Sequence, residues 1–321
     1  MTYVADRVKL NDRSSGLSQN SPSRLKFHIH CHHDRTIERR QQHSYEDRGR
    51  IIRLGRNIPL PPTFSDPFEH RVYLKFRLAQ AYRIFAKYGY DEGVAGRITV
   101  RDPIRSDCYW VNPWGVHFKL MQPELLLLVD HEGKIQEKES GPSRFLNQAT
   151  YMIHSAVYEA RPDVVCAAHS HTIHAKAFSA LGVPLDPITQ DSCAFYEDHS
   201  LYSEFRGIVE DREEGLAIAT AMGQNKAVIL QNHGILVATK SIESTVFFFM
   251  SLEKCCQVQM LADQAAAARG LRPCLIDPEN AAQTQKRLGS EMGGWFNGIP
   301  EFQLLEHEEG KRYLHRRKIC S

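Results

Sequence analysis

The sequence lacks the features that mark membrane, secreted and nucleic-acid-binding proteins. No apolar run approaches the roughly 18 residues that would span a bilayer, and the polar N-terminus has no hydrophobic signal segment. A formal net charge of +2 gives no excess of positive charge for nucleic acid or an anionic membrane. The 8 cysteines include no CxxC pair and several lie in apolar runs, as is typical of reduced thiols. We therefore expect a soluble cytoplasmic protein whose partner is a small molecule, with no nucleic acid and no membrane.

Apolar periodicity divides the 321 residues into three parts. Residues 1–58 show no periodic hydrophobicity and are rich in Arg, Ser, Gln and His, which predicts a disordered tail. Its His-rich run FHIHCHHD (27–34) is expected to have no specific role without a folded scaffold. Residues 59–275 alternate helical stripes with short apolar strands, which predicts one α/β domain around a mixed or antiparallel sheet. Residues 276–321 are expected to form a helical extension.

Start and stop signals place the elements of this domain. Asp66 and Pro67 predict a helix start, and Pro162 predicts that a helix ends just before it. The expected helices cover 68–88, 146–160, 172–181, 212–223 and 241–269. The expected strands are 96–102, 109–115, 125–130, the histidine-bearing run from 163, and two strands within 226–239.

Three histidines follow one buried strand in AAHSHTIHAK (167–176). Successive side chains of a strand point to opposite faces, so His169 and His171 share a face. That spacing lets two imidazoles reach one ion at about 2.0–2.1 Å, whereas His174 lies one helical turn further on. A third candidate is His233, in LQNHG at the end of a second apolar strand, because a buried imidazole there needs a partner. Alternatively, His233 only braces the turn by hydrogen bonding, and His154 is expected to be structural.

The sequence resembles the class II aldolase and adducin head-domain family from about residue 68 to 270. The segments that carry the resemblance are GVAGRITVRDP (93–103), NPWGVHF (112–118), RPDVVCAAHSHTIHAKAFSALG (161–182) and KAVILQNHGILVAT (226–239). The first of them resembles a glycine-rich phosphate or carboxylate loop. The resemblance implies a three-layer α/β/α sandwich around a central, mainly antiparallel sheet.

The same resemblance implies a metal centre and an oligomer. His169, His171 and His233 would hold one divalent ion, with zinc expected first and iron or manganese as alternatives. Related enzymes form a ring of four subunits with active sites at the boundaries, so we expect a homotetramer. Two further segments favour this: VFFFM (246–250) is apolar on more than one helix face, and GGWF (293–296) offers an aromatic anchor.

The sequence departs from the sugar-phosphate aldolases of that family in three respects. Their acid/base glutamate stands eleven residues before the arginine of RPD, where this chain has Thr150. Their loop asparagine is Arg97 here, and the paired serines that help to hold phosphate become Gln148–Ala149. A tyrosine that acts as an acid from the neighbouring subunit falls near Gln190. The ordinary aldolase mechanism is therefore not expected.

The remaining chemistry favours a substrate that carries a carboxylate. A metal held by three neutral histidines keeps positions open and can stabilise an enolate by Lewis acidity. Loss of CO2 forms an enolate without a base at position 150. Arg97, beside Gly96 in the glycine-rich loop, suits a bidentate pair with a carboxylate, and His174 is expected to face the substrate. Alternatively, Arg97 forms an ion pair at the surface.

Candidate proton donors lie in the segment TQDSCAFYEDHSLYSEF (189–205). Asp191, Tyr196 and Tyr202 are the expected catalytic residues, with Asp198 and His199 as further candidates. Each could instead be a solvated loop residue.

Three functions compete. The leading hypothesis is a metal-dependent carbon–carbon lyase, either aldolase-like or decarboxylating, that acts on a small oxygenated metabolite through an enolate. A second is a non-haem iron oxygenase on the same fold, although two histidines and a carboxylate are the commoner iron signature. A third is a non-catalytic interaction protein like the adducin heads, which are expected to have lost the metal histidines that this chain retains.

Overall fold

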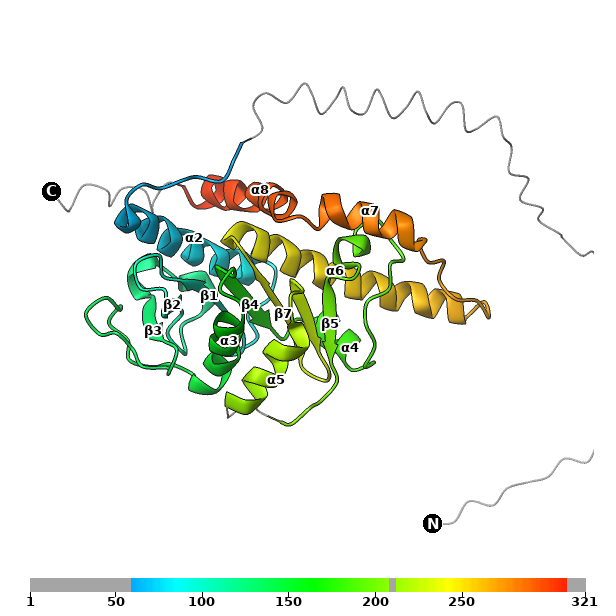
Figure 1. Cartoon of the computed structure of the whole chain (residues 1–321), viewed down its shortest axis with the longest axis horizontal. Helices are drawn as coiled ribbons and strands as arrows, with labels where there is room; N and C mark the ends of the chain where they lie inside the picture. The colour runs from blue at the N-terminus through cyan, green and yellow to red at the C-terminus, as the bar shows by residue number, and fades with distance from the viewer. Residues whose placement is uncertain (1–58, 208–211, 311–321) are drawn as a thin grey trace, which may run out of the picture. The chain divides into compact units, whose positions relative to one another are not determined.

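A computed structural model of the chain describes residues 59–207 and 212–310, apart from the side chains of residues 149 and 150. Within these residues, a 7-stranded sheet runs through the centre (Figure 1). Its strands are β1 (Arg97–Arg101), β2 (Cys108–Val111), β3 (Leu127–Asp130), β4 (Cys166–Ser170), β5 (His199–Tyr202), β6 (Ala227–Leu230) and β7 (Gly234–Thr239). The predictions for residues 1–58 lie outside the described part.

The strand order is β3-β2-β1-β4-β7-β6-β5. Neighbouring strands are antiparallel except β5 and β6, which are parallel. The histidine-bearing strand β4 therefore lies in the middle of the sheet, between β1 and β7. This arrangement confirms the α/β class and the mainly antiparallel sheet.

Helices cover both faces of the sheet. The long helices are α2 (Pro67–Lys87), α3 (Gln148–Ala160), α5 (Arg212–Met222), α6 (Ile242–Ala267), α7 (Pro278–Leu288) and α8 (Glu291–Glu309), and α4 (Ile173–Ser179) is short. Short 3-10 turns are η1 (Phe118–Leu120), η2 (Pro123–Leu125) and η3 (Ser192–Phe195). Helices α3 and α5 lie on one face, whereas α2 and α6 lie on the other with α8 packed over them (Figure 1). The three-layer α/β/α sandwich is confirmed.

Alternation along the strands assigns each side chain to one of two cores. In β4, Cys166 and Ala168 join the core beneath α2 and α6, whereas Ala167 joins the core beneath α3 and α5. His169 has the parity of Ala167, so its side chain points to the α3 face. The alternation of side chains along β4 thus determines on which side of the sheet His169 lies.

Local signals behave as the sequence predicts at several boundaries. The Asp66 carboxylate accepts a hydrogen bond from the backbone N–H of Phe68 at 2.8 Å, with proline at the first position of α2. Helix α3 ends at Ala160, two residues before Pro162. The Ser241 hydroxyl caps α6 by accepting from the Ser244 N–H.

Other boundaries differ from the prediction. The expected strand 125–130 begins only at Leu127, because Pro123 starts a 3-10 turn. The expected strand 109–115 ends at Val111, before the turn at Pro113. The segment 199–202, expected to be part of a loop, is strand β5, which forms because it pairs in parallel with β6.

The apolar face of α6 that suggested a second subunit is covered within the chain. Phe248 and Phe249 are buried in the core beneath α6 and α8, and Trp295 of α8 is also buried. A Cβ atom at Gly294 would lie 2.3 Å from the Phe248 ring, and one at Gly298 would lie 2.3 Å from the Glu243 carbonyl oxygen. These glycines let α8 pack closely on α6. Burial on two sides was therefore predicted correctly, but its cause was not.

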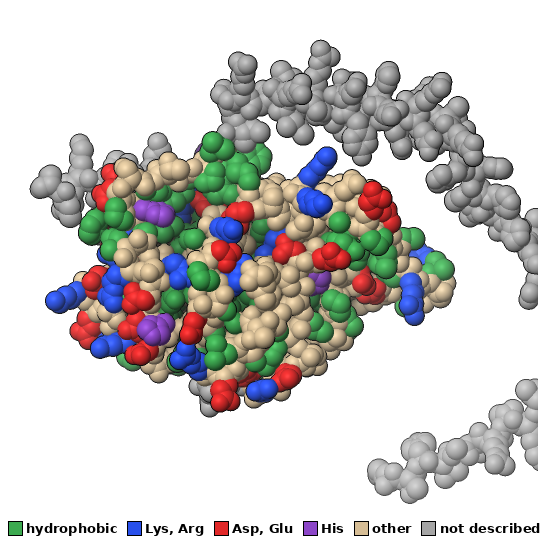
Figure 2. All heavy atoms as spheres, viewed as in Figure 1, with side chains coloured by type: hydrophobic (Ala, Val, Ile, Leu, Met, Phe, Trp, Pro, Cys, Tyr) green, Lys and Arg blue, Asp and Glu red, His purple; other side chains and the backbone are tan. Residues whose placement is uncertain are grey.

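No described helix is long and apolar enough to cross a membrane. On the face drawn in Figure 2, basic and acidic side chains are interspersed.

Candidate metal centre

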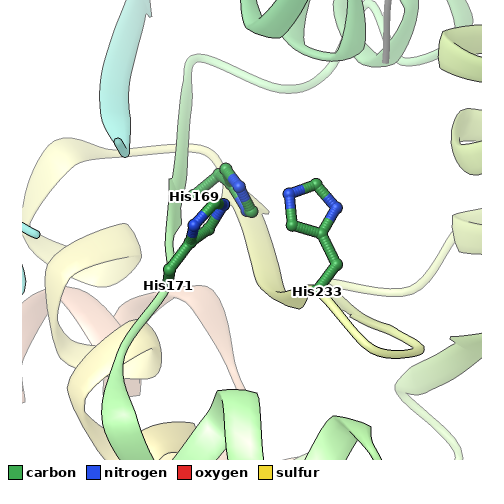
Figure 3. A group of neighbouring side chains, drawn as sticks. All are labelled: His169, His171 and His233. Carbon is green, nitrogen blue, oxygen red and sulfur yellow. The ribbon is translucent and has the colours of Figure 1, made fainter. Parts of the chain in front are cut away.

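Three histidine side chains converge at one end of the sheet. His169 lies near the end of β4, His171 follows that strand, and His233 lies in the turn between β6 and β7. One ring nitrogen from each lies within 4.8 Å of the other two. The ring centroids are 5.1, 4.8 and 4.7 Å apart, and Figure 3 shows the rings pointing toward a common point. We call these residues the three-histidine group.

Strand pairing brings these distant segments together. In the ladder between β4 and β7, Ser170 pairs with Ile235, which places the turn before β7 beside His171. The turn is closed by the backbone bond from His233 N–H to the Leu230 carbonyl at 3.0 Å. A Cβ atom at Gly234, where φ is +158°, would lie 2.8 Å from the Ser170 carbonyl oxygen. Glycine is therefore needed for the turn to approach β4.

Hydrogen bonding fixes the tautomer of His169. Its Nδ1 lies 2.9 Å from the carbonyl oxygen of Ile235, which can only accept, so Nδ1 carries the proton. Nε2 is then the lone-pair atom. Among the described residues, the buried Nε2 atoms of His169 and His171 have no hydrogen-bond partner. A backbone carbonyl that orients the far nitrogen is the usual arrangement for a metal-ligating histidine.

Burial keeps the three imidazoles neutral. It holds the pKa of His169 well below its usual range, with a further contribution from the neighbouring histidines. Burial also lowers the pKa of His171 and lowers that of His233 to about 4. Neutral imidazole is the form that binds metal. The donor set thus fits a divalent ion with three nitrogen ligands and open positions.

Arg97 lies next to this group rather than at the surface. In the ladder between β1 and β4 it stands directly opposite His169, so the two side chains share the α3 face. Arg97 is 3% exposed, and its Nη1 donates to the Asn147 carbonyl oxygen at 3.1 Å. Burial lowers the pKa of Arg97 to about 10, so the guanidinium stays charged at neutral pH.

Gly96 allows the glycine-rich loop to lie against the histidine strand. Its φ is +86°, and a Cβ atom there would lie 2.9 Å from the Ser170 Oγ and 3.2 Å from the His169 carbonyl oxygen. A larger residue would push Arg97 away from His169.

His174 is held by a carboxylate that sequence reasoning missed. Its Nδ1 lies 2.9 Å from Oε1 of Glu253, a buried residue of α6. The same carboxylate accepts from the backbone N–H groups of His174 (2.9 Å) and Ala175 (2.7 Å) and from the Thr172 hydroxyl (2.5 Å). His174 is therefore oriented from the α6 side and is not part of the three-histidine group. A charged residue within the apolar part of a long helix was the available signal for Glu253.

The three predicted proton donors lie in different places. Asp191 lines a cavity of about 480 Å³ with Met250 and Cys255 of α6, on the opposite side of the sheet from the His169 side chain. Tyr196 follows η3, which packs against α6 and α7. Tyr202 lies on the α5 side, and its carbonyl accepts from the N–H of Gln231, at the start of the His233 turn. All three roles stay predictions.

Comparison with known proteins gives one family throughout. The family model described as "Class II Aldolase and Adducin N-terminal domain" matches residues 76–260. The chain is 42% identical to "Decarboxylase NovR" of Streptomyces niveus, over 73% of this chain and 84% of that protein. It is equally 42% identical to the "4-hydroxy-3-prenylphenylpyruvate oxygenase/4-hydroxy-3-prenylbenzoate synthase" of Streptomyces roseochromogenus subsp. oscitans, over 73% and 82%.

A solved structure of a similar protein also has this fold. It is titled "L-fuculose 1-phosphate aldolase from Glaciozyma antarctica PI12". It matches with a TM-score of 0.72 and 46% identity, covering 79% of this chain and 96% of that one.

Proposed function

Because the chain belongs to the class II aldolase and adducin N-terminal domain family, we propose that it is a metal-dependent carbon–carbon lyase for a small carboxylate-bearing metabolite, and that it acts by decarboxylation. The observation that carries the proposal is the buried, charged Arg97 directly opposite His169. A buried cation next to a metal centre is suited to an anionic substrate group, because that group would offset the cost of burying the charge.

The residues have separate tasks in this proposal. A divalent ion at the three-histidine group, with zinc expected first and iron or manganese as alternatives, would supply Lewis acidity toward a carbonyl or enolate oxygen. Arg97 binds the substrate carboxylate through a bidentate pair. The Asn147 carbonyl orients the guanidinium. Burial of Arg97 and His169 keeps water away, which strengthens these polar interactions.

The relatives support a lyase and name one alternative. One 42% identical relative is named a decarboxylase, and the sequence carries no glutamate at position 150 to act as a base. The other 42% identical relative is named an oxygenase and synthase, which favours an iron-dependent oxygenase as the second candidate. The solved relative is titled a sugar-phosphate aldolase, but the departures at Arg97 and Thr150 speak against that reaction here.

Metal analysis and a substrate screen test the proposal together. The full chain, loaded separately with zinc, iron or manganese, is incubated with β-keto acids, α-hydroxy acids and L-fuculose 1-phosphate, while CO2 and O2 are measured. We expect CO2 release from an acid without O2 consumption, and no meaningful turnover of the sugar phosphate. O2 consumption only with iron would instead establish the oxygenase. Robust cleavage of the sugar phosphate would overturn the preference for carboxylates.

A homotetramer is the proposed assembly. The family resemblance supports it, whereas Trp295 and most of the run 246–250 of α6, which suggested it from sequence, are buried within the chain. Apolar side chains that stay partly exposed include Val258 of α6 (41%) and Phe296 of α8 (45%). Light scattering should give four times 36.7 kDa, and a strict monomer at micromolar concentration would refute the assembly.

A cytoplasmic location is also proposed. The described cysteines are free thiols, five of them buried, as is usual in a reducing compartment. Cell fractionation with an antibody to the chain tests this.

A further inference from the structure

A fourth buried histidine lies beside the metal centre. His154 of α3 is 1% exposed, and its Nδ1 lies 2.8 Å from the Thr99 hydroxyl. Thr99 stands two residues from Arg97 on β1 and pairs with Ala167, two residues before His169 on β4. His154 therefore covers the α3 face of the sheet next to the pair formed by Arg97 and His169.

The hydrogen bonds around His154 determine which nitrogen carries its proton. The Tyr158 hydroxyl donates to the Thr99 carbonyl oxygen at 2.9 Å, because a carbonyl can only accept. The same Tyr158 oxygen accepts from the Thr99 hydroxyl at 3.0 Å. With its single proton used, Thr99 Oγ1 must accept from His154 Nδ1–H. The Nε2 atom of His154 therefore carries a lone pair.

That lone pair lacks a donor. His154 Nε2 is buried and has no hydrogen-bond partner among the described residues, although buried polar atoms are nearly always paired. His154 is not a further metal ligand in this geometry, because the group of convergent nitrogens contains only the other three histidines.

His154 interacts electrostatically with Arg97 and with His169. Burial, together with the charge of Arg97, holds the pKa of His154 well below its usual range. His154 in turn contributes to the lowered pKa of His169. The ring is thus a neutral acceptor close to the buried cation of Arg97.

We propose that His154 Nε2 accepts a hydrogen bond from a hydroxyl of the substrate whose carboxylate Arg97 binds, and so selects hydroxy acids over their deoxy analogues. This inference rests on the proposed carboxylate-binding function. An acceptor and a cation on the same sheet face match a molecule that presents a hydroxyl donor next to an anion. A deoxy acid would leave the lone pair without a partner, which is how polar sites achieve discrimination.

Two substitutions test the two ring nitrogens of His154 separately: Nδ1, which bonds Thr99, and Nε2, the proposed acceptor. His154→Asn keeps an N–H donor near the Nδ1 position for Thr99 but removes the acceptor. His154→Gln places a carbonyl oxygen near the Nε2 position but weakens the bond to Thr99. Binding of L-lactate and of propionate, which differ by one hydroxyl, is measured by calorimetry on the zinc-loaded full chain and on each variant.

Wild-type protein should bind lactate more tightly than propionate. His154→Asn should reduce that preference by about threefold to tenfold, the range for one neutral hydrogen bond, while His154→Gln should retain part of it. Contacts of the lactate hydroxyl with zinc are common to all variants and cancel in this double comparison. Zinc content, measured on each sample, should stay at the wild-type value.

An unchanged preference in His154→Asn would refute the inference while leaving the proposed function intact. Failure of wild type to bind either acid would refute carboxylate binding itself. If a variant does not fold, ¹⁵N NMR of the wild-type histidines replaces it. The unprotonated Nε2 signal of His154 should shift upon addition of lactate but not of propionate, and equal responses to both acids would overturn the inference.

Discussion

Removal of the Arg97 charge is expected to change stability and activity in opposite directions. Burial lowers the pKa of Arg97 from 12.5 to about 10, which corresponds to a penalty on the order of 3 kcal/mol for holding the charge. Replacement by methionine removes that penalty but also the bond to the Asn147 carbonyl, worth about 1 kcal/mol. Arg97→Met should therefore raise the free energy of unfolding by about 1–2 kcal/mol.

The same change should nearly abolish turnover of an acidic substrate. Truncation of one partner of a buried, hydrogen-bonded charge pair costs about 2–5 kcal/mol, so kcat/KM should fall by at least roughly 30-fold. Arg97→Lys is the matched control, since it keeps the charge and loses the bidentate geometry. Unfolding in urea and steady-state kinetics are the two assays. Unaltered kinetics on an acidic substrate, or a clear loss of stability in Arg97→Met, would show that the guanidinium has a structural role instead.

Four further outcomes are expected. His171→Ala should lose stoichiometric metal by elemental analysis, and retention of a full equivalent would contradict the three-histidine group. Truncation to about residue 60 should leave the melting temperature nearly unchanged, and a large drop would show that the tail contributes to the fold. Metal-free protein should lose stability from pH 7 to 5. The unfolded chain takes up protons on His154 and His169, whereas burial lowers the pKa of both in the folded protein and keeps them unprotonated. A melting temperature that does not change with pH would contradict this. Glu253→Gln should destabilise the protein by about 1–3 kcal/mol, since the carboxylate accepts four hydrogen bonds around His174, and an unchanged urea midpoint would contradict that role.

Local rules explain what the sequence could predict about the site. The spacing of His169 and His171 implies a shared face from the strand period alone. The third ligand could not be derived in that way, because His233 reaches the pair only through the ladder between β4 and β7. That pairing depends on strand order, which spacing does not encode, and the family resemblance supplied it.

Tertiary packing explains the errors. The segment His199–Tyr202 has no strong strand pattern, and its conformation depends on parallel pairing with β6. The aromatic run in α6 correctly predicts burial on two sides, but a pattern cannot tell a helix of the same chain from a second subunit. Because arginine side chains are usually exposed, the sequence alone left a surface position open for Arg97. Only its register opposite His169 shows that it lies beside the three-histidine group.

The charge of Arg97 also limits which group of the substrate it can bind during decarboxylation. A guanidinium that bound only the departing carboxylate would stabilise the ground state more than the transition state, because negative charge leaves that group as CO2 forms, and the barrier would rise. Arg97 must then bind a carboxylate that the product retains, or lie near the oxygen that gains the charge. The kinetics of Arg97→Lys distinguish these cases: loss of a contact that is equal in both states raises KM alone, whereas loss of a contact to the developing oxyanion lowers kcat. A rise in kcat would mean that Arg97 binds the departing carboxylate and opposes its loss as CO2, which would contradict the two roles for Arg97 given above.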